Sequence, residues 1–333
     1  MITAFSSRYE RATLLAAALA LLLAAIASPQ AFVKKDTPAS GDCLAVVNPE
    51  VRGQAVPPPC DHQVVAELAR SGRAFAQNQL GIESAVVLGP NRTIDDARKW
   101  FEKAARQGYA PAQVNLAVLY LQGWGVPQNY GAALYWLKTA ADKGNPRAYT
   151  NLGILYLEGW GVRQDYDQAL LNFRTAAAHG ETSAMVNLGF MSDNGFGRPK
   201  DQLSAADWYR QAAERGDPMG QSNLGDMYLR GEGVPQNDGL ALEWFRKAAQ
   251  QGHTGAQIKL GFLYMTGRAT PKDAEAAYSW ILAATLAADY RGKEYLPDLE
   301  KELTPLQLAR AKQRAHVLYE TESRSAVETV LVR

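Results

Sequence analysis

Histidine and cysteine, the usual metal ligands and nucleophile partners, are too scattered in this chain to build a reactive site. The four histidines are His62, His179, His253 and His316. No two of them stand four residues apart, the spacing that places two imidazoles on one helix face to hold zinc, and two cysteines alone cannot enclose a metal. We therefore expect no metal site, and we expect His179 and His253 to be loop or helix-end residues.

Other signatures of catalysis are also missing from the sequence. It contains no Gly-x-Ser-x-Gly nucleophile turn and no phosphate-binding loop, and its Gly-x-Gly pairs do not follow predicted strands. Asp193, Asp201, Asp207 and Asp226 do not fall into a repeated carboxylate pair. The sequence predicts a protein that is not an enzyme and that needs no cofactor.

What the chain does contain is a 36-residue repeat. The leucines in register are Leu116, Leu152, Leu188, Leu224 and Leu260. Glycine columns keep the same period, one of them formed by Gly123, Gly159, Gly195, Gly231 and Gly267. A fixed period of this length is typical of a stacked-repeat array, whose copies bury their apolar faces against each other and bind partners along the stack.

Each copy is predicted to be a helix, a turn and a second helix. In residues 111–146, Pro111 suits a first helical turn, and Gly123-Trp124-Gly125 ends the helix because glycine readily adopts positive φ. Glycine directly after the repeated leucine costs about 1 kcal/mol of helix propensity, which predicts a neighbouring helix too close for a side chain. The tryptophans of the second helices are expected in the core: Trp100, Trp136, Trp208, Trp244 and Trp280.

These residues resemble a known family. Asn151-Leu152-Gly153-Ile154-Leu155-Tyr156, then Gly159-Trp160-Gly161-Val162, then Ala177 and Gly180, are similar to the Sel1-like repeat, a relative of tetratricopeptide repeats. The resemblance covers about residues 75–285 and implies an all-α, right-handed α-solenoid that serves as an interaction scaffold. Exported bacterial members are similar to this chain in plan, and several of them look like partners of envelope signalling or exopolysaccharide machinery, which is an analogy only.

One copy departs from the pattern of that family. Ser192 replaces the tyrosine, and Arg198-Pro199 replaces the valine and its neighbour. This copy is therefore the candidate for a changed turn or a bend.

The first 27 residues differ from the rest. Arg8 and Arg11 precede an unbroken apolar run from Ala12 to Ala27, which is the plan of a secretory signal and is short for a membrane span. We expect export to a bacterial periplasm with cleavage after Ala27. The alternative is an inner-membrane anchor formed by residues 12–27, with the protein facing the periplasm.

Residues 28–60 are predicted to be a proline-rich arm. Cys43 and Cys60 lie in it, and in an oxidising compartment they are expected to form one disulfide, with two free thiols as the alternative. Removing residues 1–27 takes two arginines and one glutamate from 35 basic and 34 acidic residues, which leaves a net charge of zero. Nucleic acid is therefore not an expected partner.

The repeat solenoid is predicted over residues 61–285, followed by a C-terminal cap and tail over 286–333. Thr304-Pro305-Leu306-Gln307 has the pattern of a helix start. A capping helix over 304–322 is expected to bury Leu306, Ala309, Ala315 and Leu318, and 323–333 is expected to be a loose tail.

Two residue columns are candidate contacts in a groove lined by the first helices. The first column comprises Val118, Ile154, Phe190, Asp226 and Phe262, and one turn later Glu158 and Arg230 are expected to set specificity. A varied apolar floor with a polar rim suits an amphipathic helix or an extended segment of a partner protein. The alternative is that these apolar side chains pack against the neighbouring first helix, with Phe190 and Phe262 favoured as contacts.

Two further columns have open assignments. The turn aromatics Trp124, Trp160 and Phe196 are expected either to form an edge that binds cell-wall or exopolysaccharide glycan, or to cover their own helix pairs. The column Asn115, Asn151, Asn187 and Asn223 is interpreted as a tie between repeats, with ligand binding as the alternative.

Overall fold

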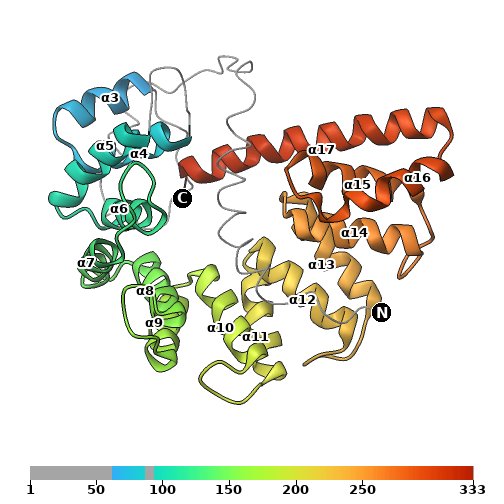
Figure 1. The fold of residues 1–333 in the computed structure, drawn as a ribbon, viewed down its shortest axis with the longest axis horizontal. Helices are drawn as coiled ribbons and strands as arrows, with labels where there is room; N and C mark the ends of the chain where they lie inside the picture. Colours follow the sequence, from blue (N-terminus) through green and yellow to red (C-terminus); the bar gives the residue numbers. More distant parts are fainter. Residues whose placement is uncertain (1–61, 87–93, 333) are drawn as a thin grey trace. The chain divides into compact units, whose positions relative to one another are not determined.

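The computed structural model describes residues 62–86 and 94–332, and side chains of its last helix as far as Glu320. Every regular element in these ranges is a helix, as the sequence predicts (Figure 1). The first helices of successive copies are α4 (Ala74–Val86), α6 (Ala110–Gln122), α8 (Pro146–Glu158), α10 (Thr182–Asn194), α12 (Pro218–Arg230) and α14 (Thr254–Thr266). The second helices are α5 (Ile94–Arg106), α7 (Tyr130–Ala141), α9 (Tyr166–Ala178), α11 (Gln202–Glu214), α13 (Asp238–Gln250) and α15 (Ala274–Leu286).

Helices outside the copies flank the array. A short α3 (His62–Arg70) precedes it, and a 3-10 turn (Tyr290–Tyr295), α16 (Leu296–Glu302) and α17 (Pro305–Val332) follow it. The chain divides into two compact units. Helices α3 to α9 belong to one unit, and the helices from α10 onward, with α17 as far as residue 326, belong to the other. Among the described helices, none is long and apolar enough to cross a membrane. The predicted signal, the arm, Cys43 and Cys60 lie outside the described residues.

The same local chemistry forms the turn in the five copies from α6 to α15. In the turn, the N-cap side chain accepts a hydrogen bond from a backbone N–H of the second helix, as Asn129 does from Ala132. The first helix ends at a left-handed glycine, such as Gly123 with φ of 72°.

The divergent copy keeps this turn. The backbone N–H of Asp201 donates to the carbonyl of Ser192 at 2.9 Å, as the N–H of Asn237 does to Tyr228. Because both partners are backbone groups, the loss of the tyrosine side chain leaves the turn unchanged.

In five of the six described helix pairs, a large side chain on the second helix fills the place left by glycine on the first, and α6 has Ala117 at this position. A Cβ on Gly153 would lie 2.5 Å from the Phe173 ring, and one on Gly225 would lie 2.8 Å from the Phe245 ring. The predicted close helix approach is therefore confirmed. The core column itself is Phe101, Leu137, Phe173, Tyr209, Phe245 and Ile281, all buried.

The prediction that the tryptophan column is core was wrong for four of its five members. Trp280 is 4% exposed, but Trp100, Trp136, Trp208 and Trp244 are half-buried. Each stands one residue before the core column, which is roughly 100° around a helix of 3.6 residues per turn. Two of these rings accept cations instead, since Lys103 lies over Trp100 and Lys247 over Trp244.

Successive copies are joined by side chains near the start of the first helices α6, α8, α12 and α14. Gln113 Nε2 donates to the carbonyl of Ala105 at 3.1 Å, and Gln221 Nε2 donates to that of Ala213 at 3.2 Å. Tyr149 performs the same role, because its hydroxyl donates to the carbonyl of Ala141 at 2.8 Å. Each tie satisfies a carbonyl at the end of the preceding second helix, where helical partners run out.

The asparagine column does not provide the expected tie between backbones. Asn151 and Asn187 donate to carbonyls four residues earlier in their own helices. Asn115 does reach the preceding first helix, where its Nδ2 donates to Asn78 Oδ1 at 2.9 Å. The interpretation was wrong for Asn151 and Asn187 because a carbonyl of the same helix lies closer to a short amide.

The last helix, α17, covers the end of the array from the predicted start. Its apolar stripe consists of the buried Ala311 and Ala315 and the half-buried Leu308 and Leu318, and Leu318 packs against the core cluster formed by α13, α14 and α15. Two predicted members of the stripe are wrong, since Leu306 is 69% exposed and Ala309 is exposed. The helix continues to Val332, past the predicted end at 322.

Polar contacts hold α16 and α17 against α15. The Tyr278 hydroxyl donates to Glu300 at 2.6 Å, and Arg310 pairs with Glu275 at 2.9 Å. The hydrogen bond from Tyr278 lowers the pKa of the Glu300 carboxyl, and burial raises the pKa of Tyr278.

Candidate partner-binding site

The first helices α10, α12 and α14 present adjacent side chains at the candidate groove position. Asp226 on α12 pairs with Lys259 on α14, with Oδ2 and Nζ 2.5 Å apart. Both side chains are about a quarter to a third exposed, at 24% and 34%. This contact establishes that side chains of neighbouring first helices meet on one face, which we call the α10–α14 face.

Two aromatic pairs flank that ion pair in repeat order. Phe190 on α10 lies 5.5 Å from Phe196 between ring centroids, and Phe262 on α14 lies 6.3 Å from Tyr295. Phe190 is half-buried and Phe262 is 36% exposed, so both rings keep accessible surface. The α10–α14 face therefore consists of an aromatic pair formed by α10 and the turn after it, a charged pair across α12 and α14, and a second aromatic pair formed by α14 and the 3-10 turn.

Arg230 belongs to the polar rim of this face. It lies one turn after Asp226 and pairs with Glu232 at 3.0 Å, with its side chain 55% exposed. Exposed ion pairs of this kind contribute little to stability.

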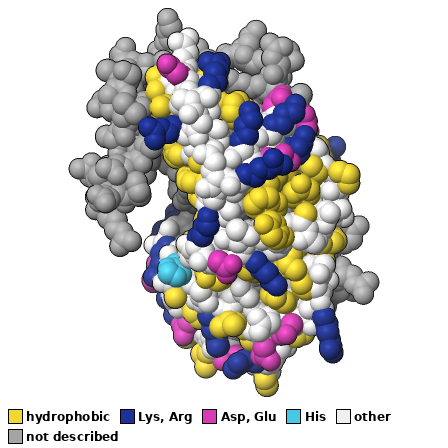
Figure 2. Space-filling view, turned by 90° about the vertical axis from the view of Figure 1, so that its left-hand side faces the viewer, with side chains coloured by type: hydrophobic (Ala, Val, Ile, Leu, Met, Phe, Trp, Pro, Cys, Tyr) yellow, Lys and Arg dark blue, Asp and Glu magenta, His cyan; other side chains and the backbone are white. Residues whose placement is uncertain are grey.

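The other unit has smaller side chains at the same repeat position. Val118 on α6 and Ile154 on α8 are half-buried, and Glu158 follows one turn after Ile154. The large exposed hydrophobic residues of this unit are instead Tyr135 and Leu171, on the second helices α7 and α9. Hydrophobic side chains also gather between charged ones on the side of the molecule that carries α3 and α7 (Figure 2).

The turn aromatics contact their neighbours rather than standing free. Trp160 stacks on Tyr130 at 5.9 Å, with 25° between the ring planes, and packs against the core of α7 and α8. Trp124 packs against the core cluster that Ile94 also joins, and it is half-buried. These contacts favour a packing role for Trp124 and Trp160, because stacking on a sugar requires an open ring face.

His253 and His179 lie at helix ends. His253 caps α14, where its Nδ1 accepts from the backbone N–H of Ala256 at 3.0 Å. Burial, with the nearby charges of Lys259 and Arg291, lowers its pKa to about 4. His179 is the exposed C-cap of α9, so both residues are helix-end residues as predicted. Across the described ranges, no three His, Cys, Asp or Glu side chains lie together in a way that could hold a metal ion.

Sequence reasoning missed Lys259 and Tyr295 as parts of the site. Lys259 occupies the repeat position of the asparagine column, one copy after Asn223, and the change from amide to cation was the available signal. Tyr295 lies after the last copy, where the period no longer predicts neighbours.

The 36-residue copies match the model of the Sel1 repeat at residues 74–109, 110–145, 146–181, 182–217, 218–253 and 254–289. The chain belongs to the Sel1 repeat family. The first helix of each copy begins at the first residue of a Sel1 repeat. These repeat starts lie one residue before the copy starts expected from the sequence. Sel1 repeat solenoids generally act as protein–protein interaction modules.

Solved structures agree with this fold. A Sel1 repeat protein from Oxalobacter formigenes is 32% identical with a TM-score of 0.59, over 68% of this chain and 90% of that one. Immunity protein Pa5087 from Pseudomonas aeruginosa is 23% identical with a TM-score of 0.50, over 70% of this chain and 85% of that one. The second likeness concerns the fold alone. A comparison with curated proteins gave no match.

Proposed function

We propose that this Sel1 repeat protein is a non-enzymatic adaptor of the cell envelope that binds a segment of a partner protein on the α10–α14 face. The observation that carries the proposal is the order of side chains there: Phe190 with Phe196, Asp226 with Lys259, and Phe262 with Tyr295. Aromatic anchors around a charged centre favour binding over self-packing, because the rings keep exposed surface while the charges set register.

The dimensions of the face suit an amphipathic helix. Packed helices lie about 8–10 Å apart, so residues on α10 and α14 are separated by roughly 20 Å. A bound helix rises 1.5 Å per residue and would need about 13 residues to reach both aromatic pairs. Its apolar side chains would contact Phe190 and Phe262, and a polar one would meet the Asp226–Lys259 pair.

The envelope location rests on the N-terminal pattern. A basic start, an apolar run ending at Ala27 and small residues before it support export, and the resemblance to exported members supports a role in envelope signalling or exopolysaccharide regulation. N-terminal sequencing of the protein recovered from the envelope is expected to begin at residue 28. An intact Met1 in the membrane fraction would favour the anchor formed by residues 12–27.

The binding proposal is tested by cross-linking in the native envelope, affinity capture and mass spectrometry. Phe190→Glu combined with Phe262→Glu is expected to abolish recovery of a protein that the wild type captures, because charge cannot enter an apolar contact. The matched control is Leu171→Glu, an equally drastic change of an exposed apolar side chain on α9. Unchanged recovery by a folded double variant, or equal loss in the control, would refute binding on this face.

A further inference from the structure

The clearest irregularity in the array lies where the turn of one copy meets the start of the preceding second helix. The contact joins residues 30 positions apart. In one unit it is aromatic, since Trp160 stacks on Tyr130. At the last such contact it is ionic, since both nitrogens of the Arg268 guanidinium edge donate to the Asp238 carboxylate at 2.7 Å.

One contact of this series is left unfilled. Its two positions are occupied by Gln202, at the start of α11, and Glu232, in the turn after α12. Glu232 pairs with Arg230 instead of reaching across to α11. An open pocket of about 530 Å³ lies at this place, and Glu232 is not among the residues that line it.

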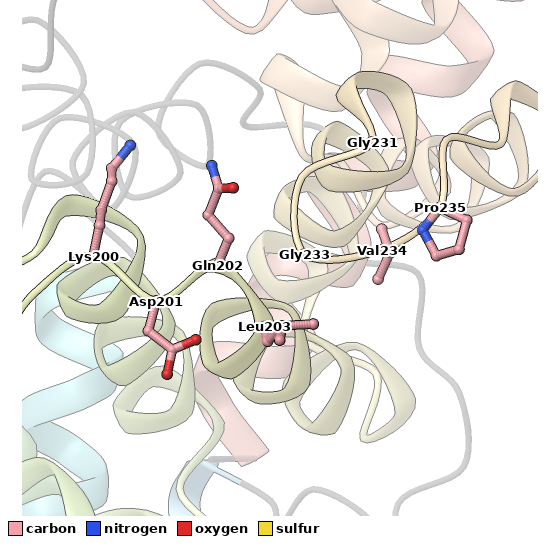
Figure 3. Close-up of a pocket in the computed structure, with 8 residues that line it drawn as sticks. All are labelled: Lys200, Asp201, Gln202, Leu203, Gly231, Gly233, Val234 and Pro235. Carbon is pink, nitrogen blue, oxygen red and sulfur yellow. The ribbon is translucent and has the colours of Figure 1, made fainter.

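The pocket is shaped by apolar side chains and fixed backbone. Leu203, 71% exposed, and Val234 lie on opposite sides of the gap, with Pro235 beside Val234 (Figure 3). A Cβ on Gly233 would lie 2.0 Å from the Gln202 carbonyl, so the turn rests directly on the start of α11 and cannot close the pocket by moving inward.

A positive charge borders the pocket. Lys200 and Gln202 project to the same side of the rim (Figure 3). The Asp201 carboxylate is already used as the cap of α11, where it accepts from the backbone N–H and the hydroxyl of Ser204. Within the described part of the chain, Lys200 forms no ion pair, which leaves its ammonium group for an acidic ligand.

We propose that this pocket is a second docking site, separate from the α10–α14 face, which receives an aromatic side chain next to an acidic residue in a segment of a partner protein. The ring would lie between Leu203 and Val234, at the repeat position that Trp160 fills in the other unit. The acidic residue would pair with Lys200 at the rim.

Titration with two short probe peptides tests the site directly. The probes are acetyl-Glu-Trp-Glu-amide and acetyl-Glu-Ala-Glu-amide, and binding is measured by saturation-transfer NMR on the full chain. A single anchored ring is expected to bind in the millimolar range, at least about five-fold more tightly than the alanine probe. Equal saturation by both peptides, or none by the tryptophan peptide, would overturn the proposal.

Variants locate the binding. Glu232→Trp should fill the pocket from within and weaken binding of the tryptophan peptide at least about five-fold, whereas Glu243→Trp on the exposed face of α13 should leave it unchanged. Leu203→Glu is a second test that does not disturb the core, because Leu203 is exposed, and it should have the same effect as Glu232→Trp. Unaltered binding by either pocket variant would refute the site.

The fold itself supplies an independent readout. Gln202→Tyr with Glu232→Trp recreates the Tyr130–Trp160 contact and is expected to raise the melting temperature by about 2–4 °C. No rise would show that the pocket does not accept a ring. Phe190→Glu with Phe262→Glu should not alter probe binding, so failure of this proposal and failure of the proposed function are distinguishable.

Discussion

The two units of this solenoid present the same repeat positions with different chemistry. On α6 and α8 the candidate contact position holds Val118 and Ile154, whereas on α10, α12 and α14 it holds Phe190, Asp226 and Phe262. On α8 and α12 the residue directly before it is a glycine that is constrained in the same way, by Phe173 in one unit and by Phe245 in the other. Packing therefore determines the glycine position and leaves the residue after it free to vary. We expect partner recognition where that residue differs between copies.

The largest stability effect is expected at the constrained glycines, and it should be the same in both units. Gly153→Ala and Gly225→Ala each place a Cβ within 2.5 and 2.8 Å of a buried ring, respectively. Each should cost about 1–3 kcal/mol of unfolding free energy in urea denaturation, because overpacking outweighs the gain in helix propensity. Gly239→Ala, exposed at the start of α13, is the control and should be neutral. A loss of unfolding free energy for only one of the two variants would show that the two units are not packed equivalently.

A pH effect should distinguish the units. At the same cap position, α14 has His253 and α8 has Asn145, and both side chains accept a backbone N–H. The pKa of His253 falls to about 4 on folding from about 6.5 in the unfolded chain. The unfolded state then binds more protons between these values, so stability is full above pH 6.5 and decreases as the pH falls toward about 4.

The loss is expected to be roughly 1–3 kcal/mol, limited by the partial exposure of the ring. Urea denaturation at pH 7 and pH 4.5 measures it. His253→Asn should remove this part of the pH dependence while keeping the cap, as Asn145 does. An identical pH profile for wild type and His253→Asn would contradict the assignment.

A smaller effect should again be common to both units. Tyr149→Phe and Gln221→Leu each remove a hydrogen bond to the end of the preceding second helix. Each should cost about 1 kcal/mol in the same denaturation assay, because a helix-end carbonyl loses its partner. Tyr135→Phe, whose ring is exposed, is the control. A negligible cost for both variants would mean that water replaces the tie.

The period was enough to predict the helices, their order and the glycine contacts. These depend on residues that recur in most copies, such as Gly153 and Gly225, so one copy reports on the others. The turn in the divergent copy also followed, because its hydrogen bond from Asp201 to Ser192 uses backbone atoms alone.

The period did not predict which of two adjacent side chains faces the core, nor the contacts that occur only once. Trp244 and Phe245 are adjacent, and both are large and aromatic, so sequence alone did not decide which one faces the core. The stripe of α17 has the same ambiguity, since Leu306 and Leu308 differ only in phase. Tyr295 and Lys259 reach the candidate site through contacts that occur once.

The central claim, that binding lies on the α10–α14 face and not on its smaller counterpart, is tested most directly by calorimetry with the captured partner. Phe190→Ala with Phe262→Ala should raise the dissociation constant at least about 100-fold, which is a loss of nearly 3 kcal/mol of binding free energy. Val118→Ala with Ile154→Ala, at the same repeat position on α6 and α8, should change it less than about three-fold. Equal losses for the two pairs, or a larger loss for Val118 and Ile154, would contradict the account.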